Sequence, residues 1–473
     1  MKKTILAVLG TMLLSTVAAA PATATAGAKL SWQDCGDGLQ CSRLTVPADW
    51  AVLKGEQITL GLAKLPARDP AAKKGTLVLN MGGPAQQISV MRQAKQAFAD
   101  LTRWFDIVVF DPRGFEASTG VRCPDPAPWA ANAEWVFPDR ATYARYTEEN
   151  HRFGLGCAEA AGPLAGNLDS GQGAHDLEAV RVALGEQKLH YYGNSYGTVL
   201  GVAYAEKFPS RVGRMYLDSP IDHTNRSWAE WLLPKAKVKE DNLHRFAEWC
   251  ATDQSCALHG RDVLQVWDEV MDRAAKRPIP APGAGAGAAA SATLIASRAT
   301  VTFDATWPEL AKSLAEAYAG DATRFAKPST GAADPDFSRI TMCADFPYPT
   351  AYGEVKAMEK RLKRAAPRIG WTIAWPLANF CTGLPRKTPF PPHPVQPRGL
   401  PPILIAGGLY DDVAPPAYAR RITAQLDGAR YMAVKGGHAL YLSGNPCIRD
   451  HVHRYLTTGQ LPPMGTTCGP ASS

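Results

Sequence analysis

The sequence predicts an α/β fold in which a mostly parallel central sheet has helices on both faces and carries an inserted, mainly helical lid. Short apolar segments alternate with helical patterns between residues 76 and 220, a rhythm typical of parallel strands joined by crossover helices. A glycine-flanked serine stands between one of these strands and the next helix. Two further apolar strands come late in the chain, after a long region of different composition.

The motif Gly-Asn-Ser-Tyr-Gly spans residues 193–197, between a strand predicted over 188–192 and a helix predicted over 198–208. A turn of this type forces strained backbone angles on the serine, and the flanking glycines avoid collisions. Ser195 is therefore the candidate nucleophile, at the head of a helix whose dipole faces the charge of acyl transfer. The N–H of Tyr196 is a candidate oxyanion donor. A chance match in a glycine-rich turn is the competing interpretation, which the neighbouring strand and helix disfavour.

Charge distribution and the absence of certain motifs argue against nucleic-acid, cofactor and metal binding. The 473 residues suffice for one large elaborated domain or two of average size, with 46% hydrophobic and 20% charged residues. The formal net charge is +7, but the positive residues are scattered, so no nucleic-acid partner is expected. The sequence has no HExxH, no P-loop and no GxGxxG after a first strand, so neither a cofactor nor a metal is expected.

Residues 1–26 have the pattern of a secretory signal peptide. Lys2 and Lys3 precede an apolar run over residues 5–20, and small-x-small cleavage sites follow at 22–26. A membrane anchor is the weaker alternative, because the run is short and no basic stop follows it. We expect a soluble monomer that is secreted or periplasmic and has no membrane anchor.

Ten cysteines support export, because disulfides persist in oxidising compartments. A zinc site is the rival interpretation, but no C-x₂-C pair is present and no His-x₃₋₅-His lies near a cysteine couple. Nearest-neighbour pairing predicts five sequential disulfides: Cys35–Cys41, Cys123–Cys157, Cys250–Cys256, Cys343–Cys381 and Cys447–Cys468.

The chain up to residue 220 supplies the first strands and two loops of interest. Strands are predicted over 44–46, 58–63, 76–79, 105–110 and 212–217, and a helix over 175–184. After the third strand, a glycine pair brings backbone N–H groups close to a ligand, so the N–H of Gly83 is the second candidate oxyanion donor. A plain turn remains an alternative there. Asp111 and Arg113 follow the fourth strand and are interpreted as scaffold, with Arg113 tying loops together through bidentate hydrogen bonds.

The rhythm changes after residue 220. The predicted division is a signal peptide over 1–26, a first core part over 27–220, a helical lid over 221–395 and a second core part over 396–473. Within the lid, residues 281–292 form a Gly/Ala-rich linker.

Two late strands complete the candidate site. Asp411 follows a strand over 402–406, and His438 follows the last predicted strand, over 431–434. A serine hydroxyl needs a base, and the base needs an acid that fixes its tautomer. Ser195, Asp411 and His438, in this order, therefore form the predicted catalytic triad. Asp412 and His223 remain the alternatives for the acid and the base.

Several segments form a recognisable set: 80–84 (NMGGP), 111–114 (DPRG), 176–185, 191–198 (YYGNSYGT), 216–218 (YLD), 411–415 and 437–438 (GH). Together they resemble the secreted tripeptidyl aminopeptidases, which are prolyl-aminopeptidase-related serine peptidases of the α/β-hydrolase fold. The resemblance covers roughly residues 40–468 and includes the tail over 447–468.

The resemblance implies that the enzyme cleaves short peptides, usually tripeptides, from free N-termini. It implies the same triad and oxyanion donors. Two departures concern the substrate: residues 85–87 read Ala-Gln-Gln where the family usually continues with glycines, and Glu116 replaces a usual glycine. A free ammonium group requires carboxylates in the lid. The candidates, none of them assigned, are Asp222, Glu230, Glu240 and Asp345.

We therefore expect a serine exopeptidase that acts on peptides with a free N-terminus. An esterase or small-amide hydrolase on the same scaffold is the alternative, motivated by the altered oxyanion loop. A binding protein that has kept the fold without catalysis is the third hypothesis.

Overall fold

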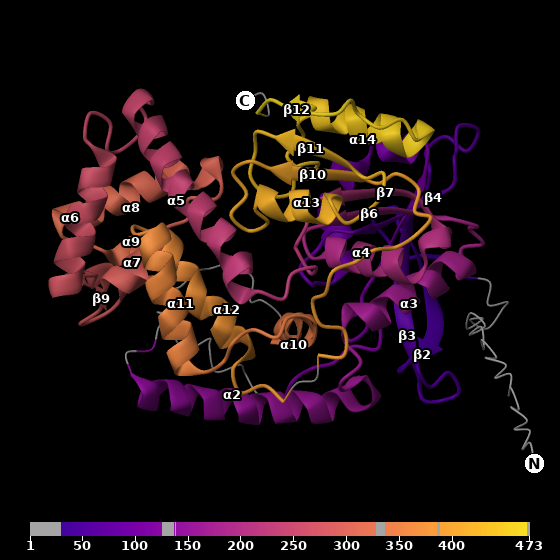
Figure 1. The fold of residues 1–473 in the computed structure, drawn as a ribbon, viewed down its shortest axis with the longest axis horizontal. Coiled ribbons are helices and arrows are strands. Elements are labelled where there is room, and N and C mark those ends of the chain that lie inside the picture. The colour runs from indigo at the N-terminus through magenta and orange to yellow at the C-terminus, as the bar shows by residue number, and fades with distance from the viewer. Residues whose placement is uncertain (1–29, 125–136, 138, 328–335, 386–387, 471–473) are drawn as a thin grey trace, which may run out of the picture.

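A ten-stranded sheet organises the molecule (Figure 1). The computed structural model describes residues 30–124, 137, 139–327, 336–385 and 388–470, so the predicted signal peptide lies outside the described residues. The strand order is β1-β2-β3-β5-β4-β6-β7-β10-β11-β12. Neighbours from β5 to β12 are parallel, whereas β1, β2, β3 and β5 pair antiparallel.

The elements have the following bounds. The strands of the main sheet are β1 (Gln33–Asp34), β2 (Gln40–Pro47), β3 (Gln57–Leu65), β4 (Thr76–Asn80), β5 (Asp106–Phe110), β6 (Leu189–Asn194), β7 (Val212–Asp218), β10 (Leu404–Gly408), β11 (Arg430–Val434) and β12 (Thr467–Cys468). The α-helices are α1 (Gln87–Ala94), α2 (Arg140–Ala161), α3 (Ser170–Ala183), α4 (Gly197–Lys207), α5 (Trp228–Thr252), α6 (Val263–Lys276), α7 (Ala292–Arg298), α8 (Trp307–Ala319), α9 (Thr323–Ala326), α10 (Asp336–Asp345), α11 (Tyr352–Ala365), α12 (Ala374–Cys381), α13 (Pro416–Thr423) and α14 (Pro446–Thr458).

Helices cover both faces of the sheet, which explains why its central strands are continuously apolar. In β4, Val78 packs in an apolar cluster with residues of α3, α4 and α13. The flanking Leu77 and Leu79 pack in the opposite cluster, with residues of α1 and α14. Because side chains alternate along a strand, one unbroken apolar run supplies both clusters.

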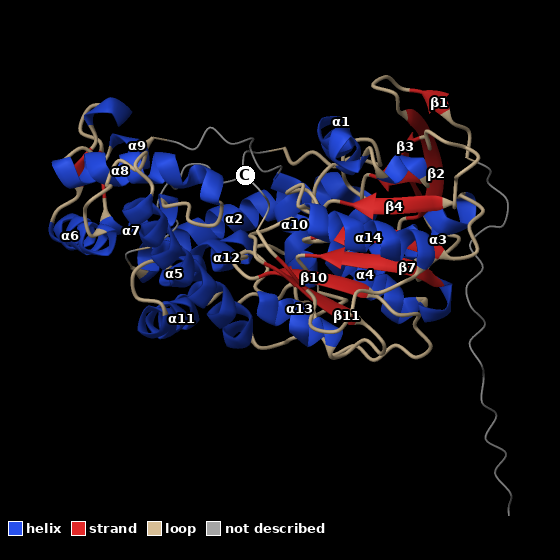
Figure 2. Ribbon diagram, turned by 90° about the horizontal axis from the view of Figure 1, so that it is seen from above, coloured by secondary structure: helices blue, strands red, loops and turns tan. Residues whose placement is uncertain are grey.

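The described part of residues 221–395, the predicted lid, is mainly helical and lies beside the carboxyl ends of the strands. Figure 2 shows β4, β7 and β10 with their arrowheads directed toward the lid helices. Most buried lid residues form one apolar cluster, and residues of α2 belong to this cluster as well. The Tyr146 hydroxyl of α2 donates to the Asn379 carbonyl oxygen 3.0 Å away. Helix α2, over whose residues no helix is predicted, therefore packs with the lid although it lies within the first predicted core part, 27–220.

The Gly/Ala-rich segment over 281–292 contains one short strand, Ala289–Ala290 (β9). It pairs antiparallel with Ile279–Pro280 (β8), directly before the segment. In the main sheet, the short β12 pairs with β11, so the prediction that residues 431–434 form the last strand is wrong. Two-residue strands escape prediction because they carry no periodic pattern.

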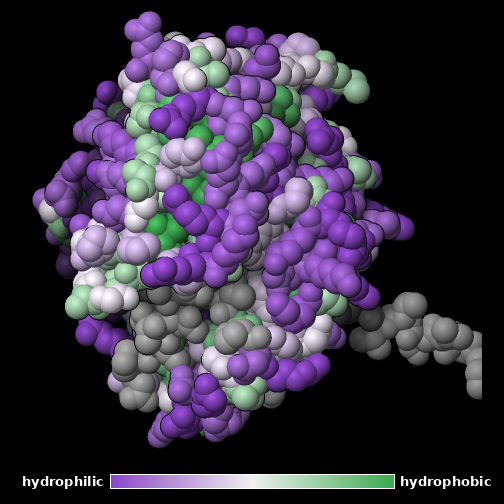
Figure 3. Space-filling model, turned by 90° about the vertical axis from the view of Figure 1, so that its left-hand side faces the viewer, coloured by the Kyte–Doolittle hydropathy of each residue, from purple (hydrophilic) through white to green (hydrophobic). Residues whose placement is uncertain are grey.

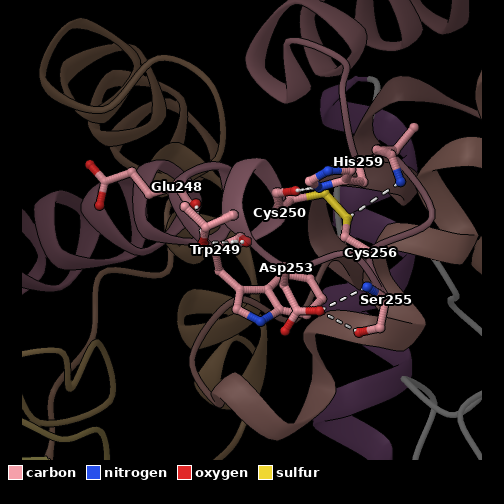
Figure 4. The surroundings of a disulfide bond; sticks show 9 residues. Glu248, Trp249, Cys250, Asp253, Ser255, Cys256 and His259 are labelled. Carbon is pink, nitrogen blue, oxygen red and sulfur yellow. Dashed lines mark hydrogen bonds between the residues drawn. A yellow bond between two sulfur atoms is a disulfide. The ribbon is translucent and has the colours of Figure 1, made fainter.

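The five predicted cysteine couples lie at disulfide distance, with Cα–Cα separations between 4.5 and 5.7 Å. Figure 4 shows the Cys250–Cys256 bond, which closes the C-terminal end of α5. There Asp253 accepts hydrogen bonds from the Ser255 N–H and hydroxyl, and a His259 ring nitrogen lies 3.2 Å from the Cys250 carbonyl oxygen. This end of α5 is held by its own short-range contacts.

The outer surface of the lid is mainly hydrophilic, with small hydrophobic patches between the polar side chains (Figure 3). Across the described residues, no helix is long and apolar enough to cross a membrane.

Candidate active site

Ser195 occupies a strained turn between β6 and α4. Its φ is 52°, in the left-handed region that non-glycine residues rarely adopt. A Cβ on Gly197 would lie 2.4 Å from the Asn80 carbonyl oxygen, so only glycine fits there. The Ser195 N–H donates to the Asp218 carbonyl oxygen at the end of β7, over 3.0 Å. Close packing against two neighbouring strands thus holds the serine in its unusual conformation.

Asp411 and His438 lie on the loops that follow β10 and β11, and they contact each other directly. The His438 Nδ1 lies 2.8 Å from Asp411 Oδ2. The other oxygen, Oδ1, accepts from the N–H groups of Val413, 3.0 Å away, and Ala414, 2.7 Å away. Asp411 is fully buried, and only 14% of the His438 side chain is exposed. The carboxylate therefore fixes the proton on Nδ1 and leaves Nε2 as the acceptor.

The two alternative residues have other surroundings. The buried Asp412 interacts with Lys239, Thr302 and Lys235. Its Oδ1 has no hydrogen-bond partner among the described residues. The His223 ring stacks on Phe390, and its Nε2 lies 3.2 Å from the Asp345 carbonyl oxygen. Burial lowers the pKa of His223 to about 4.

The loop after His438 is joined to the Ser195 turn through Asp218, a residue without an individual role in the sequence analysis. Asp218 Oδ1 accepts from the Leu440 N–H over 3.0 Å, and Oδ2 accepts from the Tyr441 N–H over 2.8 Å. The carbonyl oxygen of Asp218 accepts from Ser195. The carboxyl ends of β6, β7, β10 and β11 therefore bring the loops of the three predicted triad residues to one edge of the sheet.

The glycine loop after β4 packs against the serine. A Cβ on Gly82 would lie 2.8 Å from the Ser195 Cβ, which excludes any larger residue there. In the described part of the chain, the N–H groups of Gly83 and Tyr196 donate to no protein acceptor. A ligand oxygen beside Ser195 could therefore use both.

Gln87, one of the altered residues of this loop, has a structural role. Gln87 is fully buried: its Oε1 accepts from the Met81 N–H over 2.6 Å, and its Nε2 donates to the carbonyl oxygens of Gly82 and Ala85. A side-chain amide thus braces the glycine loop. The second departure, Glu116, is exposed.

Lid helix α10 contacts both candidate oxyanion segments. The Ser338 hydroxyl donates to the Pro84 carbonyl oxygen over 2.5 Å, next to Gly83. The Tyr196 hydroxyl donates to the Asp345 carboxylate. The lid thereby holds both segments that carry the free N–H groups.

Helix α5 of the lid contacts the loop that carries Asp411. Asn242 Nδ2 donates to the Tyr410 carbonyl oxygen over 2.9 Å, and the Arg245 guanidinium lies 3.4 Å from the centre of the Tyr410 ring. The Lys235 ammonium donates to the Val413 carbonyl oxygen. Burial lowers the pKa of Lys235 to about 8. These contacts fix α5 to the same loop whose N–H groups orient Asp411.

The four carboxylates considered for ammonium binding all have partners within the protein. Asp222 pairs with Arg421 over 2.5 Å. Glu240 accepts from three backbone N–H groups over residues 368–370. Glu230 accepts from Asn225, and Asp345 accepts from Ser170 and Tyr196. None of the four is assigned to a ligand.

Among the described residues, one cluster has side chains of the types that bind metals, but its two sulfur atoms are bonded to each other. The ligand atoms of Cys447, His451 and Cys468 lie within 4.8 Å of one another. The two sulfurs form a disulfide, which leaves a single imidazole. One neutral ligand does not hold zinc.

The pKa of His438 gives a prediction about pH. Burial is the largest influence on this pKa and lowers it, as does Lys235, but the charge and hydrogen bond of Asp411 and the charge of Asp218 raise it above its ordinary value of 6.5. A base works only when unprotonated, so we expect kcat/KM to fall as the pH drops through a midpoint above 6.5. A pH–rate profile with a chromogenic substrate measures this midpoint. Undiminished activity at pH 5 would contradict the role of His438.

Comparison with known proteins identifies the family. A family model described as the alpha/beta hydrolase fold matches residues 75–445. The chain belongs to the α/β hydrolase family. This α/β hydrolase is 28% identical to a protein of Streptomyces lividans named tripeptidyl aminopeptidase, over 96% of this chain and 89% of that protein. It is 30% identical to serine protease Hip1 of Mycobacterium bovis, over 91% of this chain and 87% of that protein.

A third relative has a different name. Carboxylesterase B of Mycobacterium tuberculosis is 27% identical to this α/β hydrolase, over 93% of this chain and 90% of that protein. The comparisons confirm the predicted fold and the predicted resemblance, and they show that the protein is a serine hydrolase.

Proposed function

We propose that this α/β hydrolase is an exported serine peptidase that releases short peptides, expected to be tripeptides, from free N-termini. The observation that carries the proposal is the Asp411–His438 hydrogen bond at the same sheet edge as the strained turn of Ser195. The similarity to a tripeptidyl aminopeptidase and to a serine protease over nearly the whole chain supports a peptide substrate.

In the proposed mechanism, His438 Nε2 takes the proton of the Ser195 hydroxyl as Oγ attacks the carbonyl carbon of the scissile bond. Asp411 holds the tautomer and stabilises the imidazolium that forms. The imidazolium then gives its proton to the leaving amine, which departs and leaves an acyl-enzyme. Water, deprotonated by the same imidazole, releases the acyl group and restores the serine.

The N–H groups of Gly83 and Tyr196 are proposed to bind the oxyanion of each tetrahedral intermediate. Both lack protein acceptors in the part of the chain that the structure describes, and both flank Ser195. Gln87 and helix α10 hold the loop of Gly83, and helix α10 also contacts Tyr196. The two N–H groups therefore need little reorganisation when negative charge develops on the substrate oxygen.

Export is part of the proposal. The predicted signal peptide over 1–26 and the five cysteine pairs at disulfide distance support an oxidising compartment.

Hydrolysis of esters is the second candidate function. The relative named carboxylesterase B and the altered residues 85–87 favour it. The same triad would attack an ester. An alkoxide is a better leaving group than the anion of an amine, so ester cleavage depends less than amide cleavage on proton donation by a general acid.

Tripeptide nitroanilides with free and N-acetylated N-termini test the proposal. We expect kcat/KM for the free peptide to exceed that for the acetylated peptide at least about 100-fold, because a lost charge-assisted contact costs on the order of 3 kcal/mol. Equal cleavage of both would exclude an aminopeptidase. Rapid turnover of aryl esters with no peptide turnover would favour the esterase.

A further inference from the structure

Asp218 is hydrogen-bonded to both halves of the proposed catalytic machinery. It is the last residue of β7, and it is fully buried. Its main-chain oxygen accepts from the N–H of Ser195. Its two carboxylate oxygens accept from the N–H groups of Leu440 and Tyr441, which follow His438 closely in the chain. One residue thus links the turn of the nucleophile to the loop of the base.

The backbone conformations at this junction require such support. Ser195, Ser219 and Ala439 have φ values of 52°, 48° and 60°. Left-handed conformations of non-glycine residues persist only where neighbours hold them. The Ala439 N–H donates to Ser219 Oγ over 3.1 Å, and that hydroxyl donates to Asp218 Oδ1 over 3.0 Å. The conformation immediately after His438 is therefore set from Asp218 and Ser219.

Asp218 also acts on the imidazole through its charge. Asp411 already occupies Nδ1, and the charge of Asp218, whose carboxylate is bound to the N–H groups of Leu440 and Tyr441, raises the pKa of His438 further. Burial raises the pKa of Asp218 itself, but the N–H groups of Tyr441 and Leu440, the Ser219 hydroxyl and His438 favour its charged form. Hydrogen bonds from backbone N–H groups are an effective means of keeping a buried carboxylate ionised.

We propose that Asp218 is a positioning residue for the base. Its carboxylate fixes the backbone after His438 so that the imidazole keeps its hydrogen bond to Asp411, and its negative charge stabilises the imidazolium that forms during catalysis. This inference rests on the proposed function. A purely structural role for Asp218 is the competing interpretation.

Asp111 provides a matched control. It follows β5, is also buried, and its two carboxylate oxygens likewise accept from backbone N–H groups, those of Ile88 over 2.9 Å and Ala117 over 3.0 Å. Asp111→Asn and Asp218→Asn therefore remove the same charge and disturb the same kind of hydrogen bonds. Only Asp218 is bonded to the loop of His438.

The experiment compares both variants with the native enzyme by kcat, KM, the pH–rate profile and thermal stability, with active sites counted by fluorophosphonate titration. For Asp218→Asn we expect kcat per active site to fall about 100-fold, the loss that a misplacement of about 1 Å causes, with KM nearly unchanged. The midpoint of the acid limb should move to lower pH, because Lys235 and Asp411 remain and the charge of Asp218 is lost. Asp111→Asn should lower the melting temperature and leave the midpoint in place, with a smaller loss of kcat, because it acts on the site only through the N–H of Ile88 beside Gln87.

Native values of kcat per active site and of the midpoint in a folded Asp218→Asn enzyme would overturn the inference. If this variant does not fold, Ser219→Ala takes its place. It removes the hydroxyl that accepts from the Ala439 N–H and donates to Asp218 Oδ1, and kcat should fall at least about tenfold, as for the loss of hydrogen bonds that hold the loop of His438. An unchanged kcat in Ser219→Ala would likewise overturn the inference that Asp218 positions the base. Failure of the proposed function would be visible separately, as activity that survives in Ser195→Ala.

Discussion

Asp411→Asn is expected to lower kcat about 10⁴-fold while the protein stays folded. Oδ1 of Asp411 accepts from the N–H groups of Val413 and Ala414, so an asparagine would place its oxygen there. Its NH₂ group would then face His438 Nδ1 and donate to it, which moves the ring proton to Nε2. An imidazole in this tautomer cannot accept the proton of Ser195.

Asp412→Asn is the control, because it makes the same change one residue away. Asp412 is buried, and the charges of Lys239 and Lys235 and a hydrogen bond with Thr302 favour its ionised form. Its loss should change kcat by less than about tenfold, since no hydrogen bond to the imidazole is removed. Steady-state kinetics of both variants decide between the two acids. A larger loss in Asp412→Asn than in Asp411→Asn would contradict the assignment.

Ser195→Ala is expected to lower kcat about 10⁶-fold, because no other group can form the acyl-enzyme. Substrate binding should persist, since the variant deletes one hydroxyl and leaves the N–H groups of Gly83 and Tyr196 in place. Single-turnover kinetics, with binding of a product-like peptide measured alongside, separate the two effects. A residual rate within about 100-fold of the native enzyme would show that another residue carries the reaction.

Features that depend on local pattern could be predicted from the sequence. The strand before Ser195, the helix after it and the two late strands have the expected apolar residues, and the order of parallel strands then places Asp411 and His438 at one edge. The pattern alone does not decide between Asp411 and Asp412. The hydrogen bond to His438 distinguishes them in the structure.

Features that depend on long-range contacts could not be predicted. The role of Asp218 requires the pairing of β7 with β10 and of β10 with β11, which brings residues 222 positions apart into contact. Helix α2 has a mainly polar sequence, and its buried tyrosines pack on lid helices far along the chain. The sequence does not show that Asp222, Glu240 and Asp345 are engaged, because their partners, such as Arg421 for Asp222, are distant in the chain.

The central claim is that Ser195 attacks the substrate and carries the acyl group. Reaction of the native enzyme with a fluorophosphonate, followed by mass spectrometry of proteolytic peptides, tests it most directly. We expect one adduct, on Ser195, with parallel loss of activity and no adduct in Ser195→Ala or after acidification below the pKa of His438. A stoichiometric adduct on another residue, or full turnover by an enzyme whose Ser195 is completely labelled, would contradict the claim.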